Sequence, residues 1–90
     1  MTKAELIDAL QTAVGGSAYG DALIAEANAT YGDEDKKYGQ NMKDRIDEKL
    51  GLLKAYAKIH EHEGESEKAK VEEEKVAILE KALAAIENLK

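Results

Sequence analysis

Apolar residues recur every three or four positions from Tyr38 to Leu89, and only a polar stretch over residues 61–66 interrupts them. This spacing aligns them along one face of an α-helix. The pattern predicts two long helices, over about residues 33–62 and 66–89. Because few residues separate the two helices, we expect them to fold back on each other as a long antiparallel hairpin.

Residues at the expected helix ends agree with these boundaries. Asp33 is a suitable N-cap for the first long helix, and acidic residues follow it, where the helix dipole favours negative charge. Gly64 interrupts the pattern, and Ser66 is a suitable N-cap for the second long helix.

Each long helix carries a second apolar stripe beside the first. It comprises Leu52, Tyr56 and Ile59 in the first long helix, and Val71, Ile78, Ala82, Ala85 and Leu89 in the second. Two helices that meet along one stripe each cannot cover both, so the N-terminal segment, a second copy or another protein must cover the rest. Tyrosine is common at interfaces, although the four tyrosines suit the edge of a core equally well. Tyr31 and Tyr38 are the better interface candidates, because a continuous helix would place them on one side. The predicted interface residues are Tyr31, Tyr38, Leu50, Leu53, Tyr56, Ile59, Ile78, Leu79, Leu83 and Ile86.

The N-terminal third predicts two shorter helices. Thr2 and Glu5 match a capping box that begins the first helix, and Gly15-Gly16 ends it. Ser17 is a suitable cap for the second helix, which Gly32 ends. We expect a single helical domain over residues 1–90, in which residues 1–32 either pack on the hairpin over residues 33–90 or extend from it as an arm.

Composition favours an all-α fold. The chain contains no proline, and its only aromatic residues are four tyrosines. No run of alternating apolar and polar residues indicates a β-strand. A domain of 90 residues buries a low fraction of its surface, so association with another chain is an expected source of stability.

The net charge of −6 is unevenly distributed along the chain. Seven glutamates and three lysines give residues 61–75 a net charge of −4. Such a run is typical of a solvated helix face; the alternative is a mimic of a phosphate backbone that binds a basic protein. Residues 4–35 contain no lysine or arginine, so we expect no direct binding of nucleic acid there. The acidic patch comprises Glu61, Glu63, Glu65, Glu67, Glu72, Glu73 and Glu74.

His60 and His62 are the side chains most suited to a metal. Two residues apart on a helix, they project about 200° apart, so they share a metal only if the helix unwinds. We favour an ordinary interpretation, in which both are exposed in the last helical turn and complement its dipole. The carboxylates lie in a polar segment without aromatic residues that would form a pocket, so we expect no catalytic site, cofactor or metal.

These features predict a non-enzymatic structural or scaffolding protein, which self-associates or docks into a larger assembly through its apolar helix faces. A component of a phage or virus particle is one such setting. The alternative is an acidic helical regulator or inhibitor that binds the basic surface of a nucleic-acid-binding protein. No apolar segment is long enough for a signal peptide or a membrane span, which favours a soluble protein inside a cell or in a virus particle. An engineered chain also fits, although the glycine-interrupted region over residues 15–39 argues against idealised design.

Overall fold

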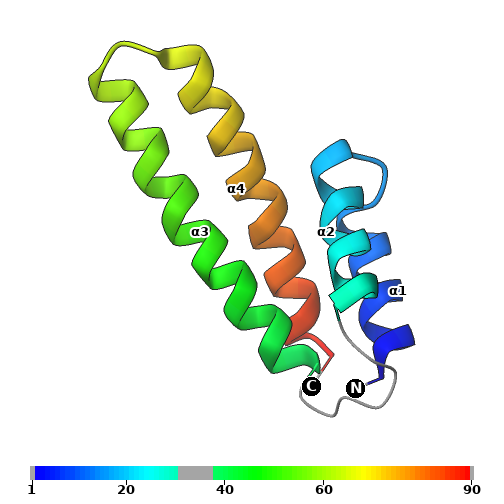
Figure 1. Ribbon diagram of the computed structural model, residues 1–90. Helices are drawn as coiled ribbons and strands as arrows, with labels where there is room; N and C mark the ends of the chain where they lie inside the picture. The colour runs from blue at the N-terminus through cyan, green and yellow to red at the C-terminus, as the bar shows by residue number, and fades with distance from the viewer. Residues whose placement is uncertain (1, 31–37, 90) are drawn as a thin grey trace.

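The computed structural model describes residues 2–30 and 38–89 of the chain (Figure 1). These residues form four helices and no strand, so the prediction of an all-α fold is confirmed. The helices are α1 (Lys3–Val14), α2 (Ala18–Thr30), α3 (Tyr38–His62) and α4 (Ser66–Glu87). Asp33 and Tyr31, to which the sequence assigned a cap and an interface role, lie outside the described residues.

The two long helices, α3 and α4, lie side by side and run in opposite directions (Figure 1). Lys43 lies near Glu87 at one end of the pair, with Nζ 3.6 Å from Oε1. At the other end, which we call the tip, residues 63–65 make the turn between the helices. Gly64 has φ +80° there, a conformation that favours glycine.

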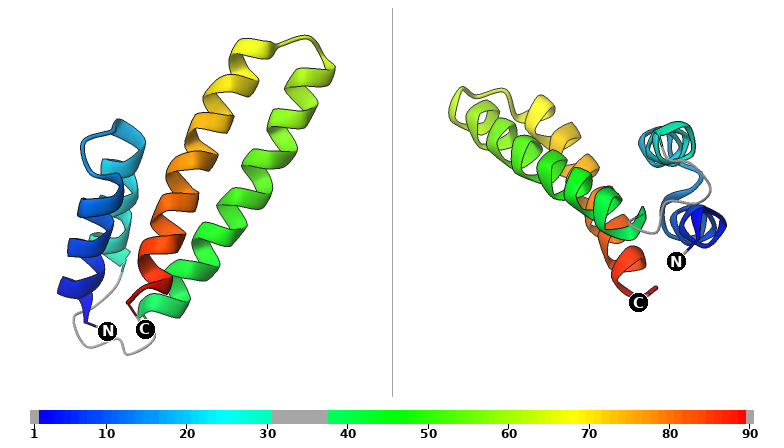
Figure 2. Two further views of the ribbon diagram at one scale, coloured as in Figure 1. Left: turned by 180° about the vertical axis from the view of Figure 1, so that it is seen from behind. Right: turned by 60° about the horizontal axis from the view of Figure 1, so that its bottom comes forward.

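The two shorter helices, α1 and α2, form a second antiparallel pair, which lies beside α4 (Figure 2). This pair reaches only part of the way along α3 and α4, so the tip extends beyond it. Residues 2–30 therefore pack on the long helices and do not extend as an arm.

The capping box predicted at the start of α1 is present. The backbone N–H of Glu5 donates to Thr2 Oγ1 at 3.2 Å, and the N–H of Thr2 donates to Glu5 Oε1 at 3.3 Å. For α4 the predicted cap is wrong by one residue. Glu65 occupies the cap position without a side-chain cap, and Ser66 is the first helical residue. The carboxylate of Glu65 is bound instead to Lys68, with Nζ 3.1 Å from Oε1.

The turn between α1 and α2 depends on two glycines. Gly16 has φ +96°, as the predicted end of α1 requires. Gly20 lies inside α2, but a Cβ atom added there would stand 1.9 Å from the carbonyl oxygen of Val14. Ser17 stabilises this close contact between α2 and the end of α1. Its Oγ accepts from the N–H of Gly20 at 3.0 Å, and its hydroxyl donates to the Val14 oxygen at 3.2 Å.

All four helices contribute to one apolar core. Its members are buried from water, and burial of apolar surface contributes about 25 cal/mol per Å². The N-terminal pair covers the second stripe of α4 over the C-terminal half of that helix, which is why α4 contributes to the core on two sides. The buried core residues are Leu6, Leu10, Val14, Leu23, Ala27, Met42, Ile46, Leu50, Leu79, Ala82 and Ile86.

Candidate interaction surface

Three large apolar side chains on α3 are open to water. Leu52, Tyr56 and Ile59 are 58%, 51% and 48% exposed. They follow one another by four and three residues, so they lie along one side of the helix. We call these three residues the α3 stripe. Val71 on α4, 50% exposed, is the other large apolar residue with this exposure in the described part of the chain.

The α3 stripe remains exposed because α1 and α2 pack mainly on α4, whereas Val71 lies beyond the end of the N-terminal pair. Tyr19, near the start of α2, lies under Lys75 of α4, whose Nζ is 5.4 Å from the ring centre. Val71 is one helical turn nearer the tip than Lys75. The second stripe of α4 is therefore covered at Ile78 and Ala82, beside α1 and α2, and open at Val71 toward the tip.

Most of the predicted interface residues lie inside the molecule. Leu50, Leu79 and Ile86 are buried in the core, and Leu53, Ile78 and Leu83 pack against it half-buried. Tyr56 and Ile59 are the predicted residues that stay exposed. The side chain of Tyr38 and all of Tyr31 lie outside the described part.

Sequence reasoning did not single out Leu52 and Val71 as interface residues. Both belong to second stripes, so periodicity contained the signal for them. Periodicity could not separate them from Leu83 or Ile86, because it does not show which faces of the long helices the other helices cover.

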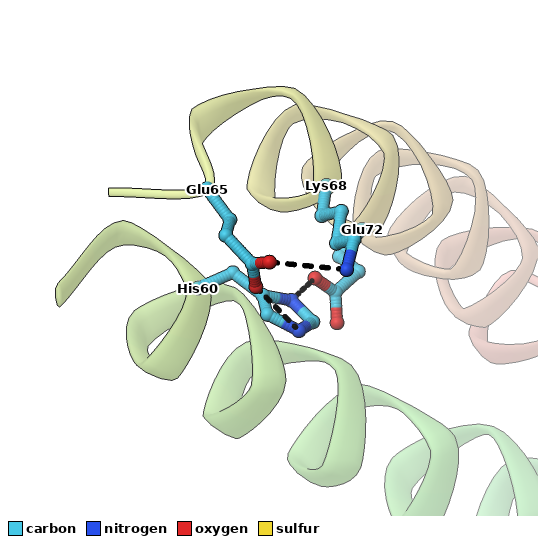
Figure 3. A network of polar contacts seen from close by, with 4 residues as sticks. All are labelled: His60, Glu65, Lys68 and Glu72. Carbon is cyan, nitrogen blue, oxygen red and sulfur yellow. Dashed lines mark hydrogen bonds and ion pairs between the residues drawn. The ribbon is translucent and has the colours of Figure 1, made fainter. Parts of the chain in front are cut away.

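A network of polar side chains lies at the tip, next to the α3 stripe (Figure 3). His60 Nδ1 is in contact with the carboxylate of Glu72 on α4, and its Nε2 is 3.8 Å from Glu65 Oε2. Lys68 binds the other oxygen of Glu65. The network joins the end of α3, the turn and the start of α4.

The two histidines differ in their surroundings. The side chain of His60 is only 23% exposed, so the expectation that it is exposed is wrong; His62 is exposed, as expected. His60 points toward α4 because it follows the buried Ala57 by three residues, which places both on the same side of α3. Among the described residues, no three histidine, cysteine or acidic side chains are grouped so that they could hold a metal ion.

The acidic patch lies around the tip, and its members are not equivalent. Glu65 and Glu72 are half-buried and bound within the network, and the other five are exposed. A hydrogen bond with Glu61, together with slight burial and the charge of Glu61, raises the pKa of Glu73. Two carboxylates of the patch, one from each long helix, are therefore close enough to repel each other.

An ion cluster between α2 and α3 was not anticipated from the sequence. Glu26 Oε1 accepts from Arg45 Nε at 3.0 Å, and Glu26 Oε2 is 3.3 Å from Lys49 Nζ. Burial raises the pKa of Glu26, but the hydrogen bonds and charges of Arg45 and Lys49 together lower it below its ordinary value. This cluster links α2 to α3 through side chains.

The chain matches no protein-family model, no curated protein and no solved structure. In the described ranges, none of the four helices is both long and apolar enough to span a membrane.

Proposed function

We propose that this chain is a non-enzymatic structural or scaffolding protein, which self-associates or docks into a larger assembly through the α3 stripe. In this proposal the working part is the long antiparallel hairpin of α3 and α4. The shorter helices α1 and α2 hold one end of the hairpin together and leave its tip free for contact.

The observation that carries this proposal is the arrangement of Leu52, Tyr56 and Ile59. Single exposed apolar residues are ordinary on a protein surface. Here three large ones share one side of one helix, and each is about half exposed. Covering them with a partner would remove apolar surface from water, which is the main favourable term in protein association.

The proposal is tested by the mass in solution, measured by light scattering on a sizing column over a range of protein concentrations. We expect an oligomer whose population grows with concentration and survives about 0.5 M salt, since apolar contacts are not screened. Leu52→Asp should shift the population to monomer. Ala77→Asp, at an exposed alanine on α4, is the matched control and should not.

A monomer at every concentration and salt would contradict self-association. Leu83, although a predicted interface residue, is unsuitable for this test. It packs against the core, so Leu83→Asp would disturb folding rather than association.

A second candidate function, an acidic inhibitor of a basic protein surface, rests on the carboxylates at the tip. Glu61 and Glu73 lie within hydrogen-bond reach despite their like charge, and a basic partner would relieve that repulsion. This function predicts binding that weakens steeply with salt and is lost on charge reversal at Glu73 and Glu74. Salt-resistant association that needs Leu52 would favour the first function.

A further inference from the structure

Two charges of opposite sign flank the α3 stripe at equal distances from Tyr56. Lys49 precedes Tyr56 by seven residues, and Glu63 follows it by seven. Seven residues make about two helical turns, so the three side chains lie on nearly the same side of the helix. The stripe thus has a cation at one end and an anion at the other.

Glu63 keeps the helical direction although it follows the last residue of α3. Its backbone N–H donates to the carbonyl oxygen of Ile59 at 3.0 Å, which is the bonding pattern of an α-helix. Its side chain is exposed. Lys49 is 35% exposed, and its Nζ lies 3.3 Å from Glu26, so its position is fixed from the side of α2.

Such a surface complements a copy of itself turned end to end. An antiparallel copy brings Tyr56 against its own counterpart and places each lysine opposite a glutamate. A basic partner helix would meet Lys49, and an acidic one would meet Glu63. Among partners that cover the whole stripe, a second copy avoids both repulsions.

We propose that a second copy of this chain docks along α3 in the antiparallel direction, with the two-fold axis at Tyr56. Lys49 then pairs with Glu63 of the partner subunit, and Glu63 with Lys49 of the partner subunit. This inference rests on the proposed function, since it names the occupant of the same stripe.

The size of the contact sets its strength. The segment from Lys49 to Glu63 is about 21 Å long at 1.5 Å per residue. A stable interface covers about 800 Å² on each partner, which is roughly one-seventh of the 5706 Å² of solvent-accessible surface of the chain. The three half-exposed side chains of the stripe supply less than this area, so we expect a weak dimer that dissociates on dilution.

Single cysteines test the geometry, because the natural chain has none. A disulfide requires Cα atoms about 4.4–6.8 Å apart. In the antiparallel dimer Tyr56→Cys meets its own counterpart and forms a covalent dimer under mild oxidation. The two copies of Leu52→Cys stand about 12 Å apart along the axis and do not cross-link. Lys58→Cys, on the other side of α3, is the matched control and also does not cross-link.

Charge exchange gives a second test that leaves the stripe intact. Glu63→Lys and Lys49→Glu should each weaken dimerisation by roughly fivefold, because each places like charges in contact. An equal mixture of the two variants restores opposite charges at both positions, so mixed dimers should form at least as well as the natural dimer. Circular dichroism of each variant confirms that its helices are retained.

The outcomes separate this inference from the proposed function. If the natural chain dimerises but Tyr56→Cys does not cross-link, or Leu52→Cys cross-links efficiently, the antiparallel arrangement is overturned and self-association still stands. A mixture of charge variants that dimerises no better than each alone would also overturn it. A natural chain that stays monomeric would overturn both this inference and self-association, and would leave docking onto another protein as the proposed function.

Discussion

The rings of Tyr56 and His60 stack on each other along α3, with their centres 6.5 Å apart and their planes inclined by 21°. His60 is bound in turn to Glu72 of α4. The central residue of the α3 stripe is thereby connected to the polar network that joins the two long helices. Tyr56 is consequently presented to solvent in a restrained position, which reduces the entropy that a partner must overcome.

His60 should contribute more to stability than His62. His60→Ala removes the contact with Glu72 and leaves a carboxylate that is only 13% exposed without its ring partner. We expect the free energy of unfolding to fall by about 1–2 kcal/mol, measured by urea denaturation. His62→Ala, at the exposed histidine, is the control and should change it little. Equal effects of the two substitutions would contradict the network.

Glu26 should make stability depend on pH in the acid range. Burial raises its pKa, but Arg45 and Lys49 together lower it by more, so the net pKa lies below its ordinary value. The folded state therefore binds the proton less tightly than the unfolded state does. The resulting stabilisation is present above the ordinary pKa of a glutamate and is lost as the pH falls through the lowered value. Glu26→Gln should cost about 0.5–1 kcal/mol at neutral pH and nothing in strong acid. A pH-independent difference would show that charge is not the cause.

Glu73 should have the opposite effect on the pH dependence of stability. Its pKa is raised, chiefly by the hydrogen bond with Glu61, so the folded state binds the proton more tightly than the unfolded state does. Ionisation therefore opposes folding above the raised pKa, and this effect disappears below the ordinary value. Glu73→Gln should raise the melting temperature at neutral pH but not in acid. Glu74→Gln, at an exposed neighbour, tests whether any loss of negative charge has the same result.

Alanine substitutions at two glycines within helices should change the free energy of unfolding in opposite directions. Gly20→Ala would place Cβ 1.9 Å from the Val14 carbonyl oxygen, so the turn must shift. We expect a loss of about 2–3 kcal/mol in the free energy of unfolding. Gly51→Ala meets no atom within 4 Å and should gain about 0.5–1 kcal/mol from helix propensity. Thermal or urea unfolding distinguishes them, and a stabilised Gly20→Ala would refute the close approach.

Local features of the structure could be predicted from the sequence without knowledge of the fold. The capping box of Thr2 and Glu5 involves residues three apart, and the left-handed glycines 16 and 64 mark turns that neighbouring residues require. The apolar periodicity gave the all-α class and the approximate extent of the helices. Such features depend on interactions within a few residues, so the sequence alone specifies them.

The tertiary structure decided which apolar residues face water. Leu83 and Tyr56 both belong to the periodic stripes, yet Leu83 packs against the core and Tyr56 does not. Whether each is covered depends on which faces of the long helices pack against other helices, and this arrangement involves contacts far apart in sequence, such as that of Glu26 with Arg45. Apolar periodicity shows that a residue needs a packing partner. Only the packing of the four helices shows whether the chain itself provides one.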